Sequence, residues 1–392
     1  MNPTFLGSLM RISLDLTTVN SGTTVPLTPV ATAKWRGVRF GMAQLMYTEA
    51  ELMRDHEFAQ LHVVEGRRMH GGMLADGTYQ PPRALVREPA LLAWADALRA
   101  RGGNLLDADS SLLSGERIPG VEQSRILLRH GLGETFWNTL TITGKIEAKG
   151  RLLAEVAFPD LAPYIVEDIS NMAIGHLNKG LLKAHGLDEG GLPGEGIGGH
   201  DEMWFVARDI AFGENGYPDV HPPENIARPE AGDRVMPEVS EVVEGLLSLL
   251  MNLLVIEFRA EIGFAASQAI FRTPDLFADR RAGALEAAEI IGRIRTDEEI
   301  HVSSLRLYLG ELASVTFRTC GVGNNGESTV AGSDLIERFW NGLVHWATVE
   351  QPALGAQIQR DLIEARIMAH PQGELILAEF NAAAHSDRLV AN

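Results

Sequence analysis

Apolar residues recur every three to four positions along most of this chain, the spacing that one buried face of an α-helix produces. The longest such stretch, residues 238–271, contains the run LLMNLLVIEF. A second long helix is expected from the Thr273-Pro274 turn to about Arg318. The pattern predicts a mainly α protein, with further helices from Val38 to about Arg68, from Pro89 to Arg101, from about Pro119, at 136–156, 164–186 and 201–213, and two more within 334–384.

Segments rich in Gly, Pro, Asp and Ser separate the expected helices. FPDLAP (158–163) is expected to break one helix, and Gly186 to end the next as its C-cap, followed by the glycine-rich loop GLDEGGLPGEGIGG (186–199). Residues 1–35 indicate a loose or partly extended arm, and Asn104–Gly120 a loop. The chain is expected to divide into an N-terminal arm with helices (1–120), a central bundle (121–318) with an insertion at 187–237, and C-terminal helices (319–392).

Composition narrows the classes of function. The 392 residues carry a net charge of −18 without a Lys/Arg cluster, so nucleic acid is not an expected partner. A single cysteine, Cys320, excludes an internal disulfide framework and indicates a reducing compartment. The most apolar run, Leu246 to Ile256, is too short to span a bilayer, and the N-terminus lacks a signal-peptide pattern. A cytoplasmic protein without membrane contact is expected.

Glu298 and His301 are the first candidates for chemistry. Residues three apart on a helix lie on the same face, so both side chains can reach one ion. Such a pair also arises by chance on a solvated helix face. The preceding helix carries Glu257 directly after its apolar run, where a buried carboxylate needs a cation or a hydrogen-bond donor. In an antiparallel hairpin Glu257 and Glu298 fall at similar heights, although an ordinary salt bridge remains an alternative for Glu257.

A weaker echo of this arrangement lies earlier in the chain. Glu147 follows an isoleucine and stands two before a lysine, as Glu257 follows an isoleucine and stands two before an arginine. His176 lies on the next expected helix, and residues 172–176 align with residues 297–301 on their histidines. The two helix pairs are therefore interpreted as a degenerate internal repeat, each contributing a Glu and a His.

Two helix pairs that each supply a Glu from the first helix and Glu-x-x-His from the second resemble the ferritin-like dimetal carboxylate proteins. Asp297-Glu298-x-x-His301 also resembles the Asp-Glu-x-x-His sequence of ribonucleotide reductase small subunits. The resemblance covers about residues 134–318. It implies a ferritin-like four-helix bundle core with extra N-terminal and C-terminal helices, an Asp297 that bonds the histidine of the other half, His176, and the metal ligands Glu147, His176, Glu257, Glu298 and His301.

One position departs from the family pattern. Ala173 stands where the first half would have its bridging glutamate, so one carboxylate of a complete site is missing. The missing ligand is expected elsewhere, with Asp168, Glu167, Glu202 and Glu261 as candidates. Alternatively, the site holds one metal firmly and a second weakly, or it is vestigial.

GGHDEMWFVARD (198–209) also carries several polar side chains beside the glycine-rich loop. An aspartate N-cap on a short helix is favoured here over a lid that closes on a site.

The resemblance implies a non-haem diiron, or iron/manganese, oxidase or oxygenase that acts on a small organic substrate with O₂. Glu257 and Glu298 would hold or bridge the metals. A homodimer is expected, and an electron-donor protein is left open as a further partner. The alternatives are a manganese catalase or ferroxidase activity on the same fold, and a metal-free helical scaffold or binding protein.

Overall fold

The two longest helices form the centre of the fold. In the computed structural model, which describes residues 45–113, 115, 117–223, 226–229, 234–320 and 328–390, α9 (Glu241–Arg272) packs against α10 (Arg281–Ala313). Ser240 caps α9, because its side chain accepts a hydrogen bond from the Val243 nitrogen. The sequence predicted that the second helix begins at the Thr273-Pro274 turn. In the structure Thr273 is the C-cap of α9, and a 3₁₀ turn (Ala278–Arg280) precedes α10.

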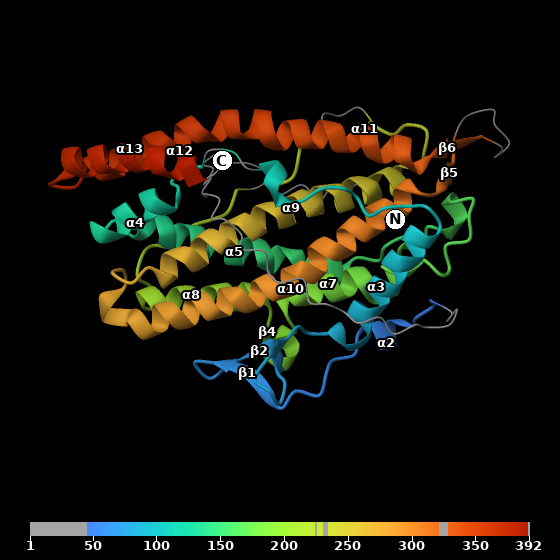
Figure 1. Ribbon diagram of the computed structural model, residues 1–392, viewed down its shortest axis with the longest axis horizontal. Helices are drawn as coiled ribbons and strands as arrows, with labels where there is room; N and C mark the ends of the chain where they lie inside the picture. Colours follow the sequence, from blue (N-terminus) through green and yellow to red (C-terminus); the bar gives the residue numbers. More distant parts are fainter. Residues whose placement is uncertain are drawn as a thin grey trace.

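Shorter helices complete the central layer. α8 (His200–Phe212) packs between α5 (Glu134–Gly150) and α10, and these helices run with α9 along the long axis of the molecule (Figure 1). α6 (Leu152–Glu155) continues α5, and α7 (Leu182–Gly190) packs against α5, α6 and α8. The expected helices at 136–156 and 201–213 thus have close counterparts in α5, α6 and α8.

The predicted helix at 164–186 is wrong for residues 164–181. The chain forms a 3₁₀ turn at Ala162–Tyr164, a second at Ala173–His176 and a π turn at Leu177–Leu181 before α7 begins. Gly180 has φ +112°, a conformation that no regular helix contains, so the segment bends there. α7 then passes through Gly186 rather than ending at it.

The predicted helix from Val38 to Arg68 is also wrong. Residues 38–44 and the expected arm at 1–35 lie outside the described residues, and only α2 (Glu49–Leu52) is helical in the remainder. The chain then forms β1 (Gln60–Val64) and β2 (Arg67–Met73), which are antiparallel. His62 and Val64 are buried while Leu61 and Val63 are exposed, which is the alternation of a strand.

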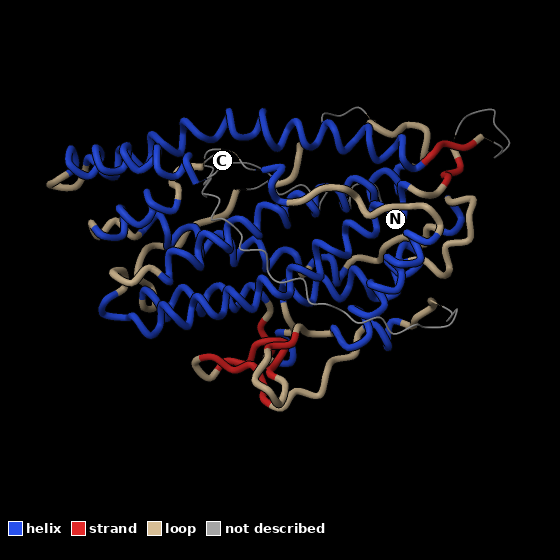
Figure 2. Tube along the Cα trace, in the orientation of Figure 1, coloured by secondary structure: helices blue, strands red, loops and turns tan. Residues whose placement is uncertain are grey.

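Two small sheets lie outside the helical layer (Figure 2). In the first, β2 pairs with β1, with β3 (Tyr79–Gln80) and, in parallel, with β4 (Ile197–Gly198), which directly precedes α8. This pairing joins the N-terminal segment to the start of α8. The second sheet is the antiparallel pair β5 (Thr316–Arg318) and β6 (Thr329–Ala331).

Further helices flank this central layer. α3 (Ala84–Ala100) contains the stretch predicted from Pro89 to Arg101, and α4 (Val121–Arg129) begins near Pro119 as expected. Where the sequence predicted two helices in 334–384, the structure has three and a π turn. The remaining elements are the 3₁₀ turns Ser110–Leu113 and Pro193–Glu195, α11 (Gly332–His345), the π turn Trp346–Glu350, α12 (Gln351–Met368) and α13 (Gly373–Val390).

The prediction of a mainly α protein is confirmed. Among the described residues, no helix is long and apolar enough to cross a membrane. Two large apolar clusters fill the interior and meet in the middle of the central layer. Along α9 one cluster extends to Phe258 and the other resumes at Phe264, and along α10 they are separated between Ile294 and Ile300. Polar side chains occupy this junction.

Candidate metal centre

Seven acidic and histidine side chains converge at the junction of the two apolar clusters. They come from five helices, and each is at most 7% exposed. Burial at this level requires that each charge be paired, protonated or bound to a cation. The set comprises Glu147 on α5, His185 and Glu189 on α7, His200 on α8, Glu257 on α9, and Glu298 and His301 on α10.

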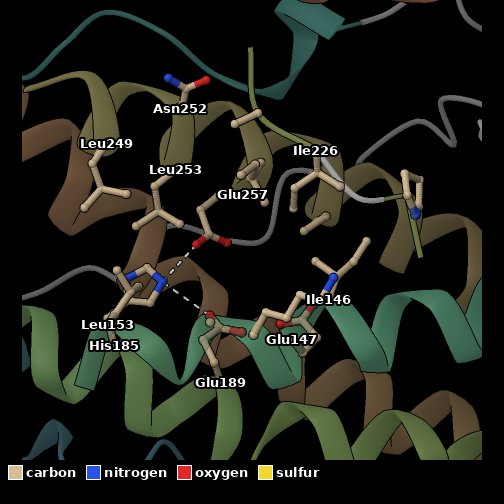
Figure 3. Close-up of a pocket in the computed structure, with 16 residues that line it drawn as sticks. Ile146, Glu147, Leu153, His185, Glu189, Ile226, Leu249, Asn252, Leu253 and Glu257 are labelled. Atoms are coloured by element: carbon tan, nitrogen blue, oxygen red, sulfur yellow. Dashed lines mark ion pairs between the residues drawn. The ribbon is translucent and has the colours of Figure 1, made fainter. Parts of the chain in front are cut away.

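One group of four faces α9. His185 Nε2 lies 3.0 Å from Glu257 Oε1 and 3.3 Å from Glu189 Oε1 (Figure 3). His301 Nδ1 lies 3.2 Å from the same Glu189 oxygen. The rings of His185 and His301 stack at 3.8 Å between centroids, with an interplanar angle of 11°. Ligand atoms of these four residues lie within 4.8 Å of one another, as the ligands of one ion would.

A second group adjoins the first. His200 Nδ1 lies 3.1 Å from Glu298 Oε1, 3.6 Å from Glu189 Oε2 and 3.8 Å from Glu147 Oε2. Glu189 belongs to both groups, with Oε1 facing the first and Oε2 the second. Glu298 likewise directs Oε1 to His200 and Oε2 to His301, at 2.9 Å. The carboxylates of Glu189 and Glu298 thus each place one oxygen beside each of the two groups.

Each of the two groups could hold a metal ion. His185 Nε2, His200 Nδ1 and Glu298 Oε1 are buried and make no hydrogen bond within the described part of the chain, although each lies close to an oppositely charged atom. Ligand atoms of a metal site have this arrangement, because they lie close together but are aimed at the ion and not at one another. Four carboxylates carry the charge that two divalent cations neutralise, and carboxylate with imidazole is a donor set that suits iron and manganese.

In the absence of metal, bound protons neutralise part of the negative charge of the cluster. Burial, and then the charge of Glu189, raises the pKa of Glu147 well above its usual value. Burial, and then Glu298, raises the pKa of Glu257 in the same way. Burial acts to raise the pKa of Glu298 too, but His301 and other neighbours outweigh it and lower this pKa to about 2. A metal ion that bound here would therefore displace protons.

Two Asp-Glu pairs orient the histidines across the site. Asp188 precedes Glu189 on α7, and its Oδ2 accepts a hydrogen bond from His301 Nε2 at 3.1 Å. Arg87 donates to the same oxygen at 2.7 Å, and Arg83 donates to Oδ1. Because Nε2 donates to Asp188, Nδ1 is the nitrogen of His301 that faces the cluster.

Asp297, which precedes Glu298 on α10, serves His200 in the same manner. Its Oδ2 accepts from His200 Nε2 at 3.2 Å, from His70 Nε2 at 3.0 Å and from the Tyr79 hydroxyl at 2.9 Å. His70, His200 and Asp297 also lie close enough to form a third possible ligand group. The three hydrogen bonds to one oxygen, however, account for their positions.

Four of the sequence-predicted site residues come together in the structure, namely Glu147, Glu257, Glu298 and His301. His176 does not join them. Its Nε2 accepts from the Tyr47 nitrogen at 3.1 Å and its Nδ1 donates to the Met172 carbonyl at 2.8 Å. Asp297 accordingly bonds His200 and not His176, and the expected alignment of residues 172–176 with 297–301 does not describe the fold.

Glu189, which is not among the candidates named from the sequence, is the fourth carboxylate of the cluster. The four candidates named for the carboxylate missing at Ala173 lie elsewhere in the described residues. Asp168 accepts from the Ser170 nitrogen and Glu167 from the Thr316 nitrogen, Glu202 pairs with Arg67, and Glu261 lies near Glu299 on the half-buried face of α9.

A signal for Glu189 was present in the sequence. Asp188-Glu189 repeats the Asp297-Glu298 dipeptide, but reading Gly186 as a C-cap placed both residues in a loop. Gly186 instead allows α7 to approach α6, because a Cβ there would lie 2.4 Å from the Ala154 nitrogen. His185 and His200 carried no such signal, since each stands beside a glycine at what the sequence indicated was the boundary of a helix.

Comparisons with protein-family models, curated proteins and solved structures found no match to this chain.

Proposed function

We propose that this protein is a dimetal oxidase or oxygenase with two iron ions, or one iron and one manganese, held by the seven-residue cluster. The observation that carries the proposal is the position of Glu189 and Glu298, which each present one oxygen to each of two adjacent ligand groups. Carboxylates that bridge two ions have this placement.

The proposed fold is a ferritin-like bundle whose second helix is interrupted. α5 and α9 each supply one glutamate, and α10 supplies Glu298 and His301 three residues apart. In place of a continuous second helix, α7 supplies His185 and Glu189, and α8 supplies His200 from its first turn. This interruption is a departure from the family pattern, and it gives the site three histidines.

The bound metals would supply the chemistry of O₂ binding and reduction. The chain's own residues fix the positions of the ions and set which ring nitrogens are free to bind them. Asp188 and Asp297 hold the Nε2 protons of His301 and His200, so that both Nδ1 atoms point inward.

An organic substrate is favoured over iron storage or peroxide breakdown by one feature. An apolar cavity opens directly onto the carboxylates of Glu147, Glu189 and Glu257 (Figure 3). An apolar cavity provides no polar groups to bind iron ions or peroxide, whereas it excludes water and can bind the carbon chain of an organic substrate.

Metal analysis of the purified protein tests the proposal. Protein produced with iron is expected to contain about two metal ions per chain, and the variant Glu298→Ala/His301→Ala should lose them while staying folded. Folded wild-type protein with far less than one metal ion would overturn the proposal in favour of a metal-free scaffold. Manganese-specific loading with rapid peroxide turnover would favour the catalase alternative.

A further inference from the structure

A cavity of about 120 Å³ lies between α5 and α9, beside the candidate metal centre. α9 contributes one stripe of apolar side chains at helical spacing, and Pro223, Ile226 and Ala227 close another side. Figure 3 shows Leu249, Leu253 and Ile226 around the carboxylate of Glu257. The apolar lining consists of Ile146, Leu153, Pro223, Ile226, Ala227, Leu249, Leu253, Ile256 and Ala260.

The polar residues of the lining are already engaged. The Asn252 side chain accepts from the Arg228 nitrogen at 3.0 Å and donates to the Ser248 carbonyl at 2.9 Å. The Asn252 side chain therefore ties the backbone at Arg228 to α9 rather than facing a ligand. Lys149 also has an interaction within the protein. The polar groups left to contact a ligand belong to the seven-residue cluster, namely Glu147, His185, Glu189 and Glu257.

The size and shape of the lining limit what fits. A cavity of about 150 Å³ lined by aliphatic and aromatic side chains binds benzene, so about 120 Å³ encloses roughly five or six carbon atoms. Every apolar side chain in this lining is aliphatic, and none offers an aromatic face for stacking. A charged group placed there would lose its hydration without a partner.

The opposite side of the cluster is filled. Asp297 lies there with His70 and Tyr79, and all three hydrogen-bond to one another through the Asp297 carboxylate. The β1–β3 sheet covers this side. The cavity between α5 and α9 is thus the approach for an organic molecule.

We infer that this cavity binds a neutral aliphatic molecule, with a chain segment of about five or six carbons enclosed against Glu257 and Glu189. This inference rests on the proposed function for its status as a substrate site, but binding itself does not require metal.

The test measures binding of hexan-1-ol, hexanoate and hexylamine by titration calorimetry, on metal-loaded and metal-free protein, with metal content determined on the same samples. Hexan-1-ol is expected to bind one per chain and at least about tenfold more tightly than either ion, since burial of a charge in this lining is unfavourable. Leu253→Trp, which fills the cavity, should weaken binding at least about tenfold and leave metal content unchanged. Leu285 lies on an exposed face of α10, so the matched control Leu285→Trp should bind hexan-1-ol as the wild type does.

If Leu253→Trp does not fold, Ile256→Trp on the same lining replaces it. The inference is overturned if hexan-1-ol shows no saturable binding, if the filled variant binds normally, or if hexanoate or hexylamine binds more tightly to the metal-loaded protein. Protein that lacks metal but binds hexan-1-ol would contradict the proposed function alone, and protein that holds two metals without binding the alcohol would contradict this inference alone.

Discussion

Asp188 and His301, 113 residues apart in sequence, are joined by a 3.1 Å hydrogen bond in the protein interior. Asp188 is also the partner of Arg83 and Arg87, and all three side chains are almost completely buried. The carboxylate thus serves two purposes, since it orients an imidazole of the candidate centre and neutralises buried guanidinium groups.

The first prediction concerns Asp188→Asn. The substitution leaves Arg83 and Arg87 without their buried counter-charge, so the free energy of unfolding should fall by about 3 to 5 kcal/mol. Denaturant unfolding measures this change. Asp297→Asn is the matched control, because its three partners are two histidines and a tyrosine. Equal losses in the two variants would show that the arginine charges are not what Asp188 stabilises.

The second prediction concerns Glu189→Ala. Because Glu189 faces both ligand groups, its removal should abolish binding of both metal ions, whereas Glu147→Ala should affect the second group first. Metal content and calorimetric metal titration measure both. Glu261→Ala, on α9 but outside the groups, should retain wild-type metal content. Two firmly bound metals in Glu189→Ala would contradict the bridging role.

The third prediction concerns Gly150→Ala. A Cβ at Gly150 would lie 2.6 Å from Glu189 Cγ, so the methyl group should displace this carboxylate and weaken metal binding without unfolding the protein. Gly263→Ala is the matched helical control. A Cβ at Gly263 meets no atom within 4 Å, so this variant should keep its metal and gain up to about 1 kcal/mol of stability from helix propensity. Equal metal binding in both would argue against the packing explanation.

The fourth prediction concerns the effect of pH on stability through His62. Burial, and then the charge of Arg293, lowers the pKa of His62 to about 4. Its Nε2 accepts from Arg293 at 2.7 Å and its Nδ1 donates to the His70 carbonyl at 3.2 Å, so the neutral ring is the form that fits.

Above pH of about 6.5 the ring is neutral in both the folded and the unfolded chain. As the pH falls from about 6.5 to about 4, the unfolded chain takes up a proton that the folded protein excludes. Stability should therefore fall over this window, by about 3 kcal/mol in total. His62→Gln should lose this component when unfolding is measured across the window. His345→Gln, at an exposed position, should follow the wild type.

Residue patterns predicted the long helices well because their apolar stripes extend over many turns. Glu257 was found because it directly follows an apolar run on a long helix, and Glu298 and His301 because they stand three residues apart on the next one. The N-terminal strands were missed because the run around His62 is short and its alternation spans only a few residues. Short apolar runs do not distinguish a strand from a helix.

The rest of the site depends on tertiary packing. Glu189 lies on α7, a nine-residue helix that contains Gly186, and the reason for that glycine is the neighbouring α6, which sequence spacing does not reveal. His200 begins α8 next to β4, whose partner strand lies about 130 residues earlier in the chain. Neither position carries a periodic signal, so only the folded chain brings them to the cluster.

The exchange of partners between the two Asp-Glu pairs has a consequence for assembly. Asp188 from the first half holds a histidine of the second, and Asp297 from the second half holds a histidine of the first. Neither half contains a complete ligand group, and each half supplies the aspartate that holds a histidine of the other. The two halves should therefore fold and unfold as one cooperative unit, and a ribosome must release the chain beyond residue 301 before a complete ligand set exists to receive metal.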